Sequence, residues 1–166
     1  MTTQPLTSKQ YLLTSRIIHG ALVSGIVLFN LVIGYLISQQ TLGTGYNKQH
    51  EIFYLIVGLM ALGSIFGGRF IFSKELEKAK TQPTFSKKLA GYQTANIIRY
   101  ALIEGAALFS TVATLLTLSV WFFVVTALLV VIFASFFPTI EKTIKDLDLN
   151  YTDQTQLKNP DAEIND

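Results

Sequence analysis

The sequence predicts an all-α membrane protein, and three observations support this prediction. Half of the 166 residues are hydrophobic and only 14% are charged, which is too apolar a composition for a soluble domain of this length. The apolar residues gather in four runs, each close to the roughly 20 residues that a helix needs to cross about 30 Å of hydrocarbon. Basic residues are also divided unevenly between the ends of these runs. Backbone polar groups in lipid must be bonded within their own segment, so we expect the runs to be helices.

The four expected transmembrane helices share this length and this low charge, and they lie at residues 17–37, 52–72, 95–116 and 120–137. Together they make a four-helix transmembrane domain that covers residues 1–140. The last two spans are separated only by residues 117–119, which predicts a tight antiparallel hairpin. Residues 141–166 hold seven acidic and three basic side chains. We expect this acidic cytoplasmic tail to start with a short amphipathic helix and to be mostly disordered beyond Asn150.

The distribution of basic residues predicts the topology. Ten lysines and arginines flank the span ends that share one side of the membrane, whereas Lys48 stands alone on the other side. By the positive-inside rule, both termini and the loop between the second and third spans are expected in the cytoplasm. The chain has no cysteine, which excludes disulfides, iron–sulfur clusters and thiolate zinc sites.

The first and third spans resemble each other in sequence. Aligning residues 17–37 with residues 97–117 without a gap gives nine identities in 21 positions. Both copies would enter the membrane from the cytoplasm. The pattern therefore predicts a duplicated helical hairpin, a parallel repeat related by an axis along the membrane normal.

Glu104 is the one charged side chain of the third span beyond Arg99. A carboxylate in hydrocarbon costs about 2.5–3.5 kcal/mol on insertion scales, so it is expected to face other helices. The intramembrane polar cluster predicted around it contains Glu104, Arg69, His19 and Tyr100. Three interpretations stay open: a structural group paired with Arg69 or bonded to Tyr100 or His19, an ion- or proton-carrying site, and a contact to another subunit.

Small residues at four-residue spacing let two membrane helices approach closely. Such positions occur in the first three spans, and the candidate packing residues are Gly20, Ser24, Gly25, Gly63, Gly67, Ala101 and Gly105.

Catalytic motifs are absent from the sequence, which has no nucleophile–histidine–acid set and no glycine-rich phosphate loop. The only histidines, His19 and His50, are expected on opposite sides of the membrane, so they do not form a metal site together. We therefore expect no enzymatic activity, no cofactor, no metal and no nucleic-acid partner. The expected partners are the lipid bilayer and either a second copy of the chain or another membrane protein.

The segment Arg-Tyr-Ala-Leu-Ile-Glu-Gly at residues 99–105 resembles small four-span bacterial membrane proteins of unassigned activity that share an Arg-Tyr-Ala-Leu-x-Glu-Gly segment. This resemblance implies a multi-pass protein of the bacterial inner (plasma) membrane. Residues 101–109 also resemble the carboxylate helix of ATP synthase proteolipids (subunit c). In that comparison Glu104 would correspond to the ion-carrying carboxylate, although the dense glycine series of those proteins is missing here.

These features predict an integral helix-bundle protein without enzymatic activity, structural or accessory, that acts through helix contacts. The alternative is a proteolipid-like unit that moves protons or sodium ions with Glu104.

Overall fold

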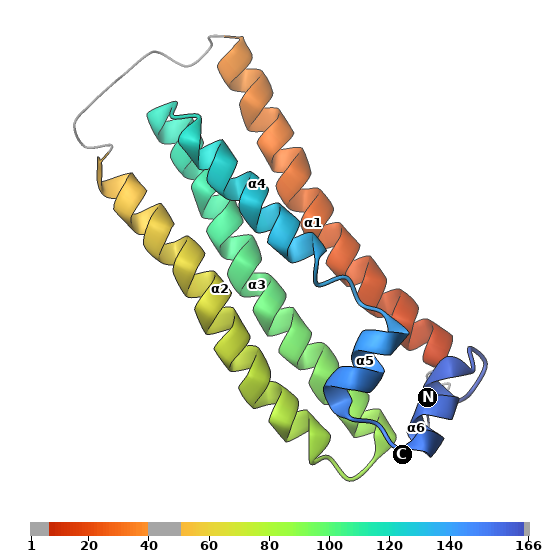
Figure 1. The fold of residues 1–166 in the computed structure, drawn as a ribbon. Helices are drawn as coiled ribbons and strands as arrows, with labels where there is room; N and C mark the ends of the chain where they lie inside the picture. The colour runs from red at the N-terminus through yellow and green to blue at the C-terminus, as the bar shows by residue number, and fades with distance from the viewer. Residues whose placement is uncertain (1–6, 40–50, 165–166) are drawn as a thin grey trace, which may run out of the picture. The chain divides into compact units, whose positions relative to one another are not determined.

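The computed structural model describes residues 7–39 and 51–164, which form six α-helices (Figure 1). Their bounds are α1 Ser8–Ser38, α2 Glu51–Lys80, α3 Phe85–Thr117, α4 Trp121–Ala134, α5 Ile140–Leu147 and α6 Tyr151–Lys158. The only extended pairing within the described residues is an isolated antiparallel bridge between Thr7 and Glu163. The all-α prediction is therefore confirmed for this part of the chain. His50 and most of the expected external loop lie outside the described residues.

Three of the helices are long and apolar enough to cross a membrane. They are α1, α2 and α3, with 31, 30 and 33 residues. Large apolar side chains lie exposed along them, for example Leu31 with 64% and Phe66 with 68% of its surface exposed. A soluble protein rarely leaves so many large apolar groups open to water, so these helices are compatible with a membrane protein.

The fourth predicted span is shorter in the structure than in the prediction. Helix α4 has 14 residues, which at 1.5 Å per residue gives about 21 Å, less than the hydrocarbon thickness. The helix ends at Ala134, three positions before Phe137. Pro138 explains part of this early end, because a proline pushes the residue before it out of the helical conformation.

The chain divides into two compact units. Unit 1 comprises the described residues within 1–20, 70–98 and 137–166, and unit 2 those within 21–69 and 99–136.

In unit 2, helices α3 and α4 form the predicted hairpin. The turn between them contains Leu118, whose φ of 55° is in the left-handed region. The Ser110 hydroxyl of α3 donates to the backbone carbonyl of Phe122 at 2.9 Å, and the Thr126 hydroxyl of α4 lies 3.4 Å from the carbonyl of Ala107. Apolar packing surrounds these contacts. The core side chains come from α1, α3 and α4, and they include Ile26, Ile103, Leu129 and Phe133.

Unit 1 is built around the turn between α2 and α3. Helix α2 ends at Lys80 and α3 begins at Phe85, with Pro83 in the turn between them. Gly91 allows them to approach closely: a Cβ placed there would lie 2.9 Å from the Cβ of Ala79. The core side chains come from α1, α2, α3 and the C-terminal helices, and they include Tyr11, Phe72, Leu89, Tyr92, Leu147 and Leu157.

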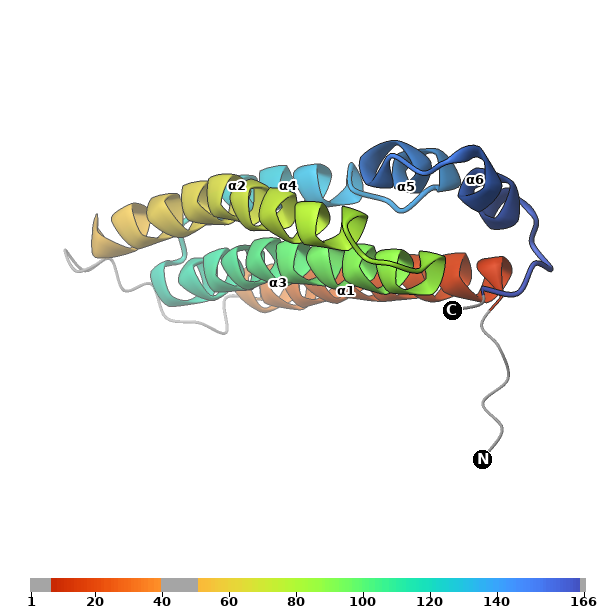
Figure 2. The same ribbon diagram turned by 90° about the horizontal axis from the view of Figure 1, so that it is seen from below.

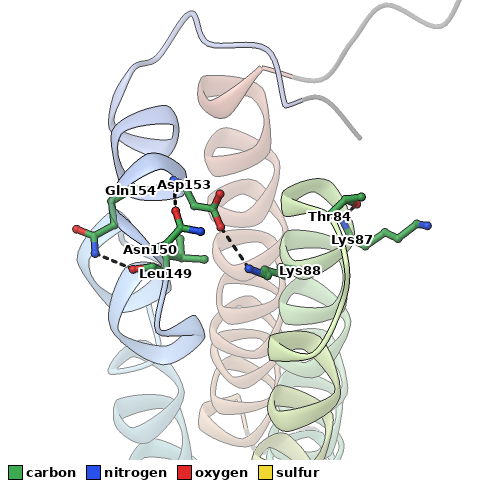
Figure 3. Close-up of polar contacts among 7 residues, drawn as sticks. All are labelled: Thr84, Lys87, Lys88, Leu149, Asn150, Asp153 and Gln154. Carbon is green, nitrogen blue, oxygen red and sulfur yellow. Dashed lines mark hydrogen bonds and ion pairs between the residues drawn. The ribbon is translucent and has the colours of Figure 1, made fainter.

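The prediction of a mostly disordered tail is wrong for the segment after Asn150, because Tyr151–Lys158 forms α6 (Figure 2). The Asn150 side chain caps this helix by accepting from the backbone N–H of Asp153 at 2.8 Å (Figure 3). Asp153 in turn pairs with Lys88 of α3 at 3.3 Å, and the Leu157 side chain is buried. Contacts to residues distant in sequence thus order a segment that is polar by composition. The amphipathic start of the tail is confirmed as α5.

The first turn of α1 is bonded to the end of the chain. Thr7 and Gln10 form a reciprocal capping pair, with the Gln10 N–H donating to the Thr7 hydroxyl and the Thr7 N–H to the Gln10 side chain. The backbone N–H groups of Ser8 and Lys9, at the start of the helix, have no partner within it. The Ser8 N–H donates to the Ala162 carbonyl and the Lys9 N–H to the Pro160 carbonyl, each at 3.1 Å.

Candidate intramembrane polar site

Glu104 lies in the middle of α3 in unit 2, and its side chain is partly exposed. All salt bridges found among the described residues join other groups and lie in unit 1. The ion pair between Glu104 and Arg69 predicted by one interpretation is therefore not formed in this structure. Arg69 is instead exposed on α2.

The other two members of the predicted cluster contact aromatic and backbone groups. The Tyr100 ring is buried in unit 2 with its centroid 5.2 Å from that of Phe133. His19 belongs to unit 1, where its buried ring packs edge-on against Phe137 with centroids 5.6 Å apart.

The Tyr100 hydroxyl has a different role from the one predicted. It donates to the backbone carbonyl of Phe136 at 3.0 Å, just beyond the end of α4. The next two carbonyls also accept from side chains: Lys142 donates to Phe137 at 3.1 Å, and Arg16 to Pro138 at 3.4 Å. Three consecutive carbonyls outside any helix thus have side-chain donors, which supply hydrogen bonds that no helix provides there.

Arg99 lies next to this segment in unit 2. Its guanidinium carbon is 4.0 Å from the ring centroid of Phe136 and 5.8 Å from that of Tyr100. At these distances the positive charge is attracted by the ring faces. Helix α2 passes close by, since a Cβ at Gly68 would lie 3.7 Å from the Arg99 side chain.

The predicted packing glycines do not make close contacts within the described chain. No heavy atom of the described residues lies within 4 Å of a Cβ placed at any of these five positions: Gly20, Gly25, Gly63, Gly67 and Gly105. Ser24 and Ala101 are likewise exposed. The close approach is instead at Gly91, where a Cβ would lie 2.9 Å from that of Ala79, whereas Gly34 and Gly68 have neighbours only at ordinary contact distances of 3.7–3.9 Å. The role of these small residues in helix packing therefore stays a prediction.

The small residues of α3 leave a surface open beside Glu104. Ile97, Ala101 and Gly105 follow one another at four-residue spacing and are all exposed. Glu104 is three positions after Ala101, so it borders this row on the helix surface. We call these four residues the α3 open face. A second helix could approach it closely and reach the carboxylate.

Comparison with protein-family models, with curated proteins and with solved structures gave no match. Among the described residues there is also no group of three or more histidine, cysteine or acidic side chains that could hold a metal ion.

Sequence reasoning missed several residues that organise the structure. Ser110 and Thr126 join α3 to α4, and Gly91 sets the distance between α2 and α3. Ser110 and Thr126 could have been found from the sequence, because hydroxyl side chains are unusual inside an apolar run. Gly91 is a lone glycine in a polar stretch, and such a residue gives no comparable signal.

Proposed function

We propose that this protein is a non-enzymatic, multi-pass component of the bacterial inner membrane that acts through helix contacts, with the α3 open face as the contact surface. The observation that carries the proposal is the position of Glu104, which has no ion pair among the described residues and borders exposed small residues. Polar side chains in membrane helices usually face protein partners. A second copy of the chain would supply such a partner.

The proposed topology has four crossings with both termini in the cytoplasm. Helix α4 together with the segment up to Phe137 makes the fourth crossing. Non-helical backbone at membrane depth is tolerated where protein groups bond to it, and the Tyr100 hydroxyl bonded to the Phe136 carbonyl supplies one such group. A duplicated hairpin would relate α1 to α3 by sequence, although α2 and α4 differ in length, with 30 and 14 residues.

The contact surface is tested by blocking it. Gly105→Leu places a large side chain on the α3 open face, and Gly63→Leu makes the same change on an exposed part of α2. Because neither position has a close neighbour, both variants should keep the thermal stability of the wild type within about 0.5 kcal/mol. Native mass spectrometry in mild detergent should show self-assembly for the wild type and for Gly63→Leu, and its loss for Gly105→Leu. A wild type that stays monomeric, or equal assembly in both variants, would contradict the proposal.

The second candidate function is the proteolipid-like movement of protons or sodium ions by Glu104. The partial exposure of this side chain favours it, because an ion-carrying carboxylate must be reachable. A hydrophobic carbodiimide should then label Glu104, and sodium ions or low pH should change the labelling rate. Labelling that is insensitive to both would remove this candidate and leave the contact role.

A further inference from the structure

A pocket with a volume of about 250 Å³ opens in unit 1 beside the first turns of α1. The lining residues from α1 include four that are spaced at i, i+3, i+4 and i+7, so they share one face of the helix: Lys9, Leu12, Leu13 and Arg16. The start of α5 and the end of α6 supply the other walls, with Ile140, Leu157 and Lys158 among their residues.

The charges that line this pocket are all positive. Lys9, Arg16 and Lys158 contribute a cation each, and none of the lining residues is acidic. The salt bridges among the described residues involve none of these three side chains. A cluster of cations without counter-charges is favourable for an anion that brings its own negative charge.

Arg16 makes two contacts beside the pocket. Its Nε group donates to the Pro138 carbonyl at 3.4 Å, and its guanidinium carbon is 5.6 Å from the ring centroid of Phe137. The Nε bond uses one of the five N–H donors of the guanidinium group, so the others can bind a ligand. Contacts of this kind orient a guanidinium group and so reduce the side-chain entropy that it loses on binding a phosphate.

The apolar part of the pocket is continuous with the membrane-facing part of α1. Arg16 immediately precedes the predicted span at residues 17–37, and Leu13 is 53% exposed one turn earlier. The pocket thus combines cations with leucine side chains, and in the proposed topology it would lie where lipid headgroups meet acyl chains.

We propose that this pocket binds one anionic phospholipid, with the phosphate between Lys9, Arg16 and Lys158 and the first part of its acyl chains against Leu12 and Leu13. A pocket of about 250 Å³ is too small for a whole phospholipid, so the remaining chain carbons would lie in the bilayer. The proposal rests on the membrane location given under the proposed function.

The test measures lipid binding to the detergent-solubilised full chain. Phosphatidylglycerol should raise the melting temperature more than phosphatidylcholine does, and native mass spectrometry should show one retained phosphatidylglycerol. The triple variant Lys9→Gln, Arg16→Gln, Lys158→Gln should lose both effects. Each basic residue near an anionic headgroup contributes roughly fivefold in affinity, so the loss should be on the order of a hundredfold.

A matched variant separates this site from general surface charge. Lys74→Gln, Lys87→Gln, Lys145→Gln removes the same charge from exposed side chains outside the pocket, and it should keep the retained lipid. Equal loss in both triple variants would overturn the proposal. The conservative change of Lys9 and Lys158 to arginine keeps both charges and should preserve binding, and a lipid-free triple glutamine variant that melts like the lipid-free wild type excludes misfolding as the cause of the loss.

Two further outcomes identify other ligands or a wrong location. If inorganic phosphate or glycerol phosphate gives the same stabilisation as phosphatidylglycerol, the ligand is a free phosphate group and the lipid proposal fails. Extraction of cell membranes with alkaline carbonate tests membrane insertion independently of the pocket. A chain released by carbonate contradicts the proposed function, whereas a retained chain that binds no lipid contradicts this inference alone.

Discussion

The Tyr100 hydroxyl joins α3 to the backbone that follows α4. It lies four residues before Glu104 on a mostly apolar helix, and it donates to a carbonyl beyond the end of α4. Tyr100 is 3% exposed, and the bond itself is partly buried. A carbonyl that loses its donor where water reaches it poorly bears part of the cost of desolvation.

We expect Tyr100→Phe to lower the free energy of unfolding by about 1–3 kcal/mol, because it leaves the Phe136 carbonyl without this donor while keeping the ring. Thermal unfolding in detergent measures the change. Tyr54→Phe is the matched control, since its hydroxyl bonds to Ser119 at 2.8 Å on a side chain that is 47% exposed. That variant should stay within about 0.5 kcal/mol of the wild type. An equal decrease in the free energy of unfolding for both variants would show that the hydrogen bond to Phe136 contributes no more than the exposed bond of Tyr54.

The sequence was sufficient to identify single side chains that are unusual in an apolar helix, but not the side chains that they contact. A carboxylate in an apolar run is enough to identify Glu104 as a candidate, because charged groups are costly in hydrocarbon. Its pairing with Arg69 could not be deduced from spacing, because the relative rotation of α2 and α3 depends on packing between the helices. The structure shows no such pair.

The packing of helix α2 against helix α3 depends on the glycine at position 91. The backbones approach at Gly91 and Ala79, where a Cβ on the glycine would also lie 3.2 Å from the Ala79 Cα. Backbone atoms cannot move aside as a flexible side chain can. The two helices must therefore separate if Gly91 gains a side chain.

Gly91→Ala should destabilise the protein by about 1–3 kcal/mol, the usual cost of overpacking a close contact. Gly63→Ala makes the same chemical change where no described heavy atom lies within 4 Å of the new Cβ. It should be neutral or stabilise by about 0.5–1 kcal/mol, because alanine restricts the unfolded chain more than glycine does. Chemical denaturation of both variants provides the comparison. A stable Gly91→Ala protein would show that α2 and α3 are not held together at this point.

The elements themselves were predictable to the extent that local sequence determines them. Long apolar runs located α1, α2 and α3, and the residues between 117 and 119 located the hairpin turn. Helix α6 was missed because its residues are polar. It is stabilised by the Asn150 cap and by the burial of Leu157, and the second of these depends on chain segments far away in sequence.

For the whole molecule, the main structural feature is that unit 1 joins three distant parts of the chain. Residues from the start of α1, from the α2–α3 turn and from the C-terminal helices share one core. Polar contacts follow the same pattern, as the Ser8 hydroxyl donates to the Gln156 carbonyl at 2.9 Å. The C-terminal segment is therefore a structural part of unit 1.

Truncation after Leu149 should remove the hydrogen-exchange protection of the Ser8 and Lys9 amides, because their acceptors at Pro160 and Ala162 are deleted. Their opening free energies should fall toward those of fraying helix ends. Amides in the middle of α3 should keep their protection. Tyr151→Ser changes an 84% exposed side chain of α6 and serves as the control that leaves all sites protected. Unchanged protection after truncation would show that the chain ends are not joined in solution.

The bonding of α1 to the end of the chain also concerns how the protein is made. A ribosome must add 151 residues after Lys9 before Pro160 exists, as the difference between 160 and 9 shows. At roughly 5–20 residues per second, this takes about 8–30 seconds. During that interval the first turn of α1 must bond to water, lipid headgroups or a chaperone. The first turn of α1 thus gains these backbone partners only after the segment around Pro160 and Ala162 has been made.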